Sequence, residues 1–541
     1  MADIAACTSI HNYSRWLDEW ADGLLSQTRR PDQVCIVDNA SNDGTPERIA
    51  VEAARLRDAG IRVDVVTLPW TVHYGRARNI AINLSRTGWA HHYDADDVLK
   101  PWAYADWEQL EPSADVVSFG WVRGRKTSEK DRVYADHQGA GTLASKAPAS
   151  AVSPFRRTLW ERAPYRDDLP GSWDTALWIG FAHLDARFRA TRRACYLYRY
   201  HADSLFVARP ASDKKQIGVR LQELRRGWLP DVSVVVPRRG DGGPRDASWS
   251  WLRRRYETLW PDWEVVVHDV DGEWNKPTVL NEAVRRTSGR VLVVTDSDIL
   301  LPAGQVEAAV AATHVHGWVM PHSTVVRLSE AETGRILEHD PAGWPDPDRT
   351  STQTRPYQAT PGGGIFMLTR TAWDDVGGFD PTFRGWGYED DAWGLAADTL
   401  LAGPLRMDGD LWHLWHPPGP RSKHPQMPAN RRRVAAYRTA AGDRHAMWEL
   451  TRHGRTTMKP DQTQLAYVSH KGRTVKVWPG TKLHRRIDAS PSWRLVDPTP
   501  SRPAVTSGAQ VRHAGGGWYE LVRDGEVVQR VRGRQAAEEL L

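Results

Sequence analysis

The feature that most constrains this chain is a repeated alternation of short apolar runs with segments of helical period. Apolar runs at residues 4–10, 34–37, 61–68 and 90–93 are separated by such segments, and the same order restarts at residue 232. Helical period is clearest between residues 17 and 25, where apolar side chains recur every three or four positions. This alternation predicts a mostly parallel sheet covered by helices, with ligands bound at the carboxyl ends of the strands.

The restart predicts an internal duplication. A basic, helix-like stretch ends at Pro230, and the order of parts then repeats as strand 232–237, helix 249–259, strand 264–268, helix 278–287 and strand 291–295. The length of 541 residues also requires more than one core, because single cores stop growing at roughly 250 to 300 residues. We expect tandem α/β domains at residues 1–212 and 231–455, joined by a helical linker at 213–230.

The C-terminal part of the chain changes character. A segment rich in Pro and Arg leads into a predicted helix around residues 432–453, and two short β-rich modules are expected at residues 460–500 and 508–541. In the last module, a strand enters a turn at Asp524-Gly525, and residues 535–541 are predicted to form a closing helix. These modules resemble units appended to actinobacterial or actinobacteriophage proteins, in keeping with the Ala, Arg and Trp bias of the chain.

Composition excludes several classes of protein. The net charge of +5 is mildly basic, but no nucleic-acid-binding motif accompanies the Arg clusters, which we interpret as solvated surface. No apolar run is long enough to span a bilayer and the N-terminus lacks a signal pattern, so we expect a soluble, cytoplasmic protein, or one of the host cytoplasm if a phage encodes it. The three cysteines, Cys7, Cys35 and Cys195, form neither a disulfide framework nor a CxxC knuckle.

Acidic clusters stand at equivalent places in the two predicted domains. Asp94-Ala-Asp96-Asp97 follows one buried strand, and Asp296-Ser-Asp298 follows its counterpart. Carboxylates two residues apart at a strand end can converge on one hard cation that also takes pyrophosphate oxygens. A lone D-x-D triplet arises readily by chance, so it is the repeated position after a buried strand that gives the motif its weight.

In the first half, residues 34–45, 75–79 and 92–97 resemble, in the same order, the successive motifs of family-two glycosyltransferases with the GT-A fold. The resemblance implies that Asp38 contacts the nucleotide base and that Asp96 and Asp97 bind a metal ion. It also implies that four further residues contact the donor: Ser9, Arg78, Asn79 and Asp94.

Two later segments of the first half extend this resemblance. Residues 173–178 and 198–204 resemble the acidic motif and the Tyr-Arg-x-His element of the same family, which makes Asp174 the base and His201 a metal ligand. This chain has Trp173 where the family has Glu, and its first strand lacks the usual proline. The resemblance therefore supports the fold of the first domain more firmly than its activity.

The second half carries the most specific motif. Residues 360–364, 376–391 and 411–416 resemble the C-terminal motif of galactosyltransferase-like and related family-two enzymes. The resemblance implies that Asp390 is the base, that Glu389 is a catalytic or acceptor-binding neighbour, and that Asp298 binds metal with His413 or His416, between which the spacing does not choose. The remaining residues implied are Gly363, Gly364 and Trp386 at the acceptor, and Pro237, Asp269, Lys276, Asn281 and Asp296 at the donor.

The function expected from these features is an inverting sugar transfer that depends on Mn²⁺ or Mg²⁺. A nucleotide-sugar, with a UDP-sugar favoured, would donate to a hydroxyl of a glycan, a protein or modified DNA. A divalent cation stabilises the charge that develops on the β-phosphate, and a carboxylate removes the proton of the acceptor hydroxyl. Templates for dinucleotide, P-loop, serine-hydrolase and zincin sites are absent from the sequence.

Two alternatives remain open. In one, only the second domain turns over and the first positions the acceptor. In the other, the chain is a sugar nucleotidyltransferase, which also uses aspartates at strand ends but needs a basic, Gly-rich loop after its first strand. Only residues 237–243 approximate such a loop.

Overall fold

The computed structural model describes residues 2–123, 132–144, 148–199, 201, 211–227, 231–269, 274–349, 353–356, 364–385, 387–417 and 425–451, and strands between residues 465 and 532. The chain divides into two compact units. One unit comprises Met1–His201 with Ser212–Met458, and the other comprises Ala202–Ala211 with Lys459–Leu541.

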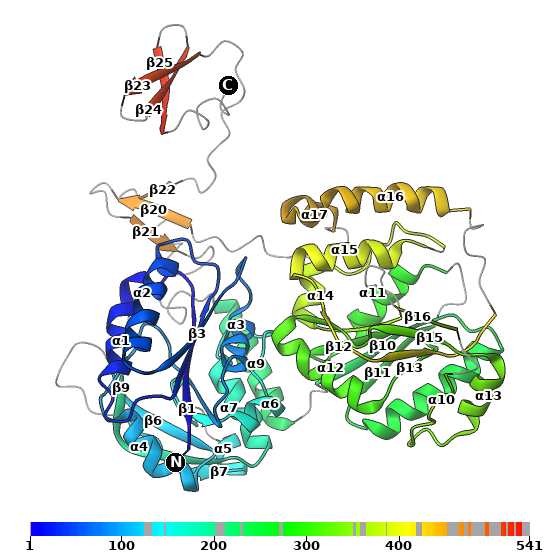
Figure 1. Ribbon diagram of the computed structural model, residues 1–541, viewed down its shortest axis with the longest axis horizontal. Coiled ribbons are helices and arrows are strands. Elements are labelled where there is room, and N and C mark those ends of the chain that lie inside the picture. The colour runs from blue at the N-terminus through cyan, green and yellow to red at the C-terminus, as the bar shows by residue number, and fades with distance from the viewer. Residues whose placement is uncertain are drawn as a thin grey trace. The chain divides into compact units, whose positions relative to one another are not determined.

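The sheet of the first half begins with parallel strands and continues with strands in mixed orientation, in which β8 is antiparallel to its neighbours and β6 runs parallel to β9 (Figure 1). The parallel strands are β1 (Ile4–Ile10), β2 (Gln33–Asp38), β3 (Arg62–Thr67) and β4 (Trp89–His92). The others are β5 (Val98–Leu99), β6 (Val116–Arg123), β7 (His137–Gln138), β8 (Phe155–Arg156) and β9 (Arg187–Tyr198). The order β3-β2-β1-β4-β8-β6-β9-β5 places β1 between β2 and β4, and β7 pairs with β9.

Helices cover this sheet, and their apolar faces match the sequence period. In α1 (Leu17–Leu25), Leu17, Trp20 and Leu24 are buried, as the spacing of apolar residues predicts. The remaining helices are η1 (Ser14–Trp16), α2 (Thr45–Asp58), α3 (Tyr74–Asn83), α4 (Ala103–Leu110), η2 (Glu111–Ser113), α5 (Ala140–Ala144), α6 (Arg157–Arg162), α7 (Trp173–His183) and α9 (Ala211–Arg226).

The second half holds two sheets. The larger has the order β11-β10-β12-β17-β14-β18, and the smaller has the order β13-β19-β15-β16. The strands of the larger sheet are β10 (Val232–Arg238), β11 (Glu264–Asp269), β12 (Val291–Thr295), β14 (Trp318–Met320), β17 (Ile365–Thr369) and β18 (Leu405–Arg406). Those of the smaller are β13 (Ile299–Leu300), β15 (Thr324–Arg327), β16 (Gln353–Pro356) and β19 (Asp410–His413).

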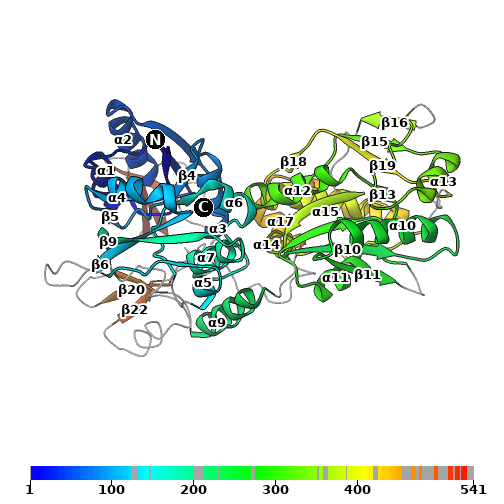
Figure 2. The same ribbon diagram turned by 90° about the horizontal axis from the view of Figure 1, so that it is seen from below.

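Helices α10 and α11 lie beside strands β10 and β11 (Figure 2). The helices of this half are α10 (Pro244–Leu259), α11 (Lys276–Arg286), α12 (Ala303–His316), α13 (Glu330–Glu338), α14 (Arg370–Val376), α15 (Glu389–Leu401), α16 (Met427–Ala440) and α17 (Arg444–Leu450).

The two halves share one pattern of strand pairing. β1 pairs in parallel with β2 and β4, and β10 pairs in parallel with β11 and β12. The next strand along is antiparallel in both cases, β8 beside β4 and β17 beside β12. The predicted mixed α/β class is confirmed, and the predicted parallel arrangement holds for the first part of each sheet.

Some predicted boundaries are wrong in detail. The helix expected around residues 432–453 is two helices, because the chain turns between α16 and α17 at Gly442, whose φ of 84° is left-handed.

The C-terminal strands are antiparallel, in the orders β21-β20-β22 and β23-β24-β25. Their bounds are β20 (Leu465–Ser469), β21 (Thr474–Val477), β22 (Trp493–Val496), β23 (Gln510–Gly515), β24 (Trp518–Arg523) and β25 (Glu526–Arg532). The turn predicted at Asp524-Gly525 and the helix predicted at residues 535–541 lie outside the described residues.

Two further expectations concern the environment of the chain. All three cysteines are buried and free. Within the described residues, no helix has both the length and the apolar character that crossing a membrane would require.

Candidate active site

The acidic pair of the second half lies where two strands meet. β12 ends at Thr295, Asp296 and Asp298 follow, and β13 then pairs antiparallel with β19 so that Ile299 lies opposite His413. The Leu414 amide also donates to the Asp298 carbonyl at 2.9 Å. This register brings the β19 end of the chain to the D-x-D segment, although more than a hundred positions separate them in the sequence.

Asp298, His413 and His416 form the group of three potential metal ligands found in the part of the chain that the structure describes. One ligand atom from each lies within 4.8 Å of the others. His416 Nε2 is 3.2 Å from Asp298 Oδ2, and the two imidazole rings are 5.2 Å apart. The structure thus brings both histidines to Asp298, where the sequence left a choice between them.

The chemistry of this group suits a divalent cation. His413 Nδ1 lies 2.9 Å from the Leu414 carbonyl, to which it can donate, and this leaves Nε2 free to coordinate. Burial lowers the pKa of His413, which favours the neutral form that a metal ligand requires. Burial alone would raise the pKa of Asp298, but a hydrogen bond from His416 and the charges around it hold that pKa below its usual value.

Lys276, at the start of α11, joins the acidic pair to a second carboxylate. Its Nζ lies 3.0 Å from Asp296 Oδ1 and 3.3 Å from Asp390 Oδ1. Burial opposes the charge of the ammonium group, yet the nearby carboxylates raise the pKa of Lys276 above its ordinary value. Burial raises the pKa of Asp390 to about 8 and also raises that of Glu389. Asp390 is therefore a carboxyl group that can take up a proton near neutral pH.

The backbone before α15 fixes where this helix begins, and with it the position of Asp390 in the first turn. Tyr388 precedes α15 with a left-handed φ of 73°, and Gly387 before it has a φ of 102°. A side chain at Gly387 would lie 2.9 Å from Met427 Cε. The Asn430 side chain holds the loop by donating to the carbonyls of Arg384 and Gly387. The Gly-rich sequence here is a packing and conformational requirement of the turn into α15.

The other donor- and acceptor-site residues predicted in the second half lie at several places in the structure. The Asp296 amide donates to the Gly364 carbonyl at 2.8 Å, and the Gly364 amide donates to Asp296 Oδ2 at 3.3 Å, because β17 runs antiparallel to β12. The Asn281 side chain bonds both the amide and the carbonyl of Phe379. Pro237 is buried in β10 opposite His268. Gly363 and Trp386 lie outside the described residues, as does the side chain of Asp269.

In the first half, too, a buried cation contacts the first aspartate of the acidic cluster. Arg78 Nη2 lies 3.0 Å from Asp94 Oδ1. Burial opposes the charge of this guanidinium group, while Asp94, Tyr165 and Asp174 raise its pKa. Asp174 lies in the first turn of α7, which, like α15, follows a left-handed residue, here Ser172 with a φ of 56°. This alignment places Trp173 in the position of Glu389 and Asp174 in that of Asp390.

The asparagines give a second point of correspondence. The Asn79 side chain bonds the amide and the carbonyl of Tyr165, as Asn281 does with Phe379. Relative to these asparagines, Arg78 stands one residue earlier and Lys276 five residues earlier in the sequence. The two positions differ by four residues, which is about one helical turn on the same face, so both cations reach the first aspartate of their acidic pair. Since both ends of each amide are engaged, Asn79 and Asn281 here position the backbone.

The metal ligands predicted in the first half meet only in part. His201 Nε2 lies 2.9 Å from Asp96 Oδ2. Asp97 is buried and accepts a hydrogen bond from the Arg199 amide. Among the described residues of this half, no three potential ligands lie as close together as Asp298, His413 and His416 do in the second half.

Two buried side-chain oxygens without a hydrogen-bond partner lie near the ends of β1 and β2. Asp38 is fully buried, and its Oδ1 accepts a hydrogen bond from the Ser41 amide. Asp38 Oδ2 and the hydroxyl of Ser9 are buried without a hydrogen-bond partner among the described residues. Ser9 pairs with Val37 and Ile10 pairs with Asp38, so Ser9 and Asp38 stand at successive register positions, where strand side chains point to opposite faces of the sheet.

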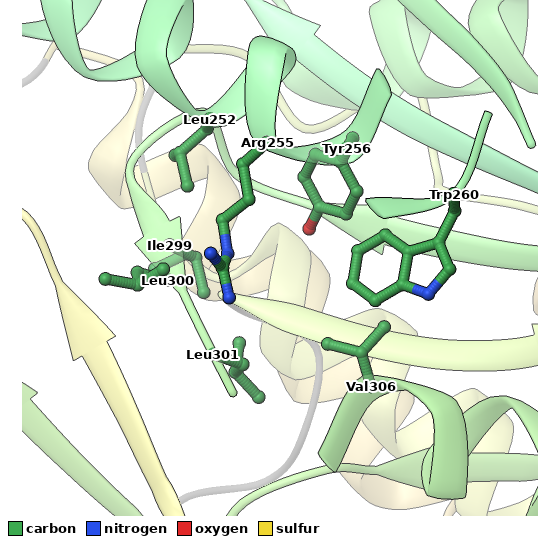
Figure 3. Close-up of a pocket in the computed structure, with 8 residues that line it drawn as sticks. All are labelled: Leu252, Arg255, Tyr256, Trp260, Ile299, Leu300, Leu301 and Val306. Atoms are coloured by element: carbon green, nitrogen blue, oxygen red, sulfur yellow. The ribbon is translucent and has the colours of Figure 1, made fainter. Parts of the chain in front are cut away.

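A small cavity of the second half lies apart from these charged groups. Its lining is mostly apolar and includes Leu252, Tyr256, Trp260 and Ile299, and Arg255 points into it (Figure 3). Arg255 donates to the carbonyl of Pro341 at 2.7 Å. This cavity is part of the core under α10, and the candidate site is the polar surface above the strand ends.

Sequence reasoning missed one residue of the site. Arg245, near the start of α10, lies with Nη2 2.9 Å from His416 Nδ1. It belongs to none of the motifs discussed above. Its position after β10, at the carboxyl edge of the sheet, was the one signal that pointed to it.

By its fold and this site, the chain is an α/β protein with paired carboxylates at the carboxyl ends of its strands. Two models of known protein families match parts of it. Residues 6–165 match the model described as glycosyl transferase family 2, and residues 350–395 match the one described as the N-terminal domain of galactosyltransferase. The first match spans β1 to Tyr165, and the second includes Gly364 and the start of α15. Each half of the chain thus contains a segment similar to a glycosyltransferase family model.

No curated protein sequence matches the chain. Among solved structures, it is similar to S. aureus TarS 1–349 in complex with UDP, at 16% identity and a TM-score of 0.32, over 41% of this chain and 65% of that one. It is also similar to the mannosyltransferase PcManGT from Pyrobaculum calidifontis in complex with GDP-Man and Mn²⁺, at 18% identity and a TM-score of 0.31, over 41% of this chain and 72% of that one. The chain spans slightly less than two thirds of the TarS fragment.

Proposed function

We propose that the chain transfers a sugar from a nucleotide-diphosphate donor to a hydroxyl acceptor, with inversion at the anomeric carbon, at two GT-A-type sites in tandem. The observation that carries this proposal is that a buried cation contacts the first aspartate of each acidic pair, Arg78 with Asp94 and Lys276 with Asp296. A carboxylate at the start of a later helix acts on each cation: Asp390 lies 3.3 Å from Lys276, and the charge of Asp174 raises the pKa of Arg78. Each set lies at the carboxyl end of equivalent strands. The two family matches to glycosyltransferases support the same activity.

In the second half the proposed chemistry needs a base, a cationic group and a leaving-group site. Asp390 removes the proton of the acceptor hydroxyl as that oxygen forms its bond to the anomeric carbon. The bond from the anomeric carbon to the β-phosphate oxygen breaks on the opposite face, and the nucleoside diphosphate leaves with the electron pair. Lys276, which lies 3.0 Å from Asp296 Oδ1, is a cation placed to interact with this charge. Asp298, His413 and His416 would hold Mn²⁺ or Mg²⁺, which supplies further stabilisation of the leaving diphosphate.

In the first half we assign the same roles to Asp174 as base, to Arg78 and Asp94 at the donor, and to Asp96 and His201 at a cation. Ser9 and Asp38 supply unpartnered buried oxygens for the nucleotide base, for which we favour uracil. We further propose that the acceptor is a glycan, a protein or modified DNA. The free, buried cysteines accord with our proposal that the reaction takes place in a reducing cytoplasm.

A second candidate arrangement is that the first half only positions the acceptor. Trp173 occupies the place of Glu389, and among the described residues Asp96 and His201 are not joined by a third ligand at the distances seen around Asp298. Both observations favour a weaker or absent reaction in the first half.

The test is to incubate the full chain with UDP-, GDP- and dTDP-sugars in the presence of Mn²⁺, and to follow nucleoside diphosphate release and products by mass spectrometry. Asp96→Asn and Asp298→Asn are compared with the unaltered chain. With two active sites, each variant removes a different product or part of the hydrolysis. Loss confined to Asp298→Asn supports the positioning role of the first half, and no turnover with any donor contradicts the proposed function.

A further inference from the structure

One nitrogen of the candidate metal centre faces two groups with opposite requirements. His416 Nδ1 lies 2.9 Å from Arg245 Nη2 and 2.8 Å from the Pro417 carbonyl oxygen. A guanidinium group only donates hydrogen bonds, and a carbonyl oxygen only accepts them. To accept a hydrogen bond from Arg245, Nδ1 must be unprotonated, whereas to donate one to Pro417 it must carry a proton. It can therefore bond only one of these two groups at a time.

Each choice sets the state of the other ring nitrogen. When a neutral His416 accepts from Arg245, its proton is on Nε2, which then donates to Asp298 Oδ2 at 3.2 Å. In that tautomer Nε2 has no lone pair for a cation. When Nδ1 of the neutral ring donates to Pro417, the Nε2 lone pair faces the Asp298 carboxylate, an arrangement that a cation between them would stabilise in place of a second proton.

Arg245 is placed to act elsewhere once His416 changes tautomer. It lies in the first turn of α10, directly after the loop at the carboxyl end of β10, and its side chain is half-buried. Its charge acts on Asp298 as well as on His416. A guanidinium group binds phosphate oxygens with two parallel hydrogen bonds, and the start of a helix favours the same negative charge.

We infer that Arg245 is a donor-binding residue that a divalent cation releases: cation binding through His416 Nε2 breaks the Arg245–His416 bond, and the freed guanidinium binds the donor's diphosphate. The inference rests on the proposed function and adds to it an order of events, with the cation before the diphosphate. It also assigns Arg245 two opposed effects, since it resists the cation and holds the diphosphate.

The first half provides an internal contrast. His201 Nδ1 is buried and has no hydrogen-bond partner among the described residues, while its Nε2 contacts Asp96. Within the described part of the chain, therefore, no guanidinium group holds His201 in the tautomer that excludes a cation. The order of binding inferred here concerns the second site.

The test uses the full chain with Asp96→Asn, which weakens cation binding in the first half, and compares Arg245→Met with Arg239→Met. Arg239 is exposed, lies on the same loop before α10 and controls for the loss of one positive charge. Calorimetry measures the Kd of MnCl₂ alone, and then the Kd of UDP and of GDP at saturating Mn²⁺. Relative to Arg239→Met, we expect Arg245→Met to bind Mn²⁺ at least about threefold more tightly and the nucleotide about tenfold more weakly.

Both effects are required. If Arg245→Met matches Arg239→Met in either measurement, or weakens Mn²⁺ binding, the inference is overturned. Arg245→Lys keeps the charge without the planar fork and is expected to fall between the two, so it serves as the test if Arg245→Met does not fold. If the chain with Asp96→Asn alone binds no Mn²⁺, or if adding His416→Ala leaves its Mn²⁺ affinity unchanged, the proposed metal site itself fails, and the inference fails with it.

Discussion

The ammonium group of Lys276 lies 3.3 Å from Asp390 Oδ1, so the first residue of α11 holds the proposed base at the start of α15. The same group lies 3.0 Å from Asp296. A donor diphosphate that recruits Lys276 would leave Asp390 free to accept a proton. In the proposed mechanism, the position of Lys276 would therefore couple donor binding to the protonation state of Asp390.

Lys276→Met is expected to shift the pH dependence of transfer. Burial raises the pKa of Asp390 to about 8 and the charge of Lys276 opposes that rise. The base must be ionised, so kcat/KM should increase with pH through a midpoint near 8 in the unaltered chain and at higher pH in Lys276→Met. Lys276→Arg should keep the midpoint close to its original value. An unchanged midpoint in Lys276→Met would show that the charge of Lys276 does not affect the pKa of the base.

Asp390→Asn is expected to remove transfer and keep donor binding. Loss of a general base costs about 10²- to 10⁴-fold in rate, whereas the amide preserves the size of the side chain. Steady-state kinetics measures the rate, and calorimetry with UDP measures the affinity. Asp391→Asn is the matched control, because Asp391 lies in the same helical turn and is partly exposed. Equal losses in both variants would mean that the helix start, and not the base, is damaged.

Removal of divalent cations is expected to abolish transfer reversibly. Dialysis against EDTA should stop turnover at the second site, and Mn²⁺ should restore it. His416→Ala should bind Mn²⁺ more than about tenfold more weakly, because it removes a ligand that contacts Asp298. His445→Ala, an exposed position on α17, should bind like the unaltered chain. Full activity in EDTA would rule out the metal centre.

Gly387→Ala is expected to destabilise the fold by about 1 to 3 kcal/mol, because a side chain is strained in left-handed backbone. Its φ is 102°, and the new Cβ would lie 2.9 Å from Met427 Cε. Chemical denaturation of Gly387→Ala and of the control Gly334→Ala measures the free energy of unfolding. Gly334→Ala, within α13 and with open space around it, should instead be neutral or stabilising. Equal stability of the two variants would contradict the role of the turn.

Much of the fold can be predicted from the sequence because its elements are local. The apolar runs of β1, β2, β10 and β12 and the helical period of α1 mark these elements directly. The break at Gly442 was missed because helix-favouring residues lie on either side of the Gly442-Asp443 pair, although a Gly followed by an Asp N-cap marks the start of a new helix. The proximity of Asp298 to His413 and His416 was predicted, but the sequence left open which histidine takes part.

The sequence by itself determined the order of strands and helices, their repetition, and the two acidic pairs at strand ends, since these depend on neighbours a few residues apart. Only the tertiary structure decided that Lys276 contacts Asp390, that both histidines reach Asp298, and that Arg245 bonds His416. Each of these contacts depends on the register between segments remote in the chain. That register is set by packing of the whole domain, which no local pattern specifies.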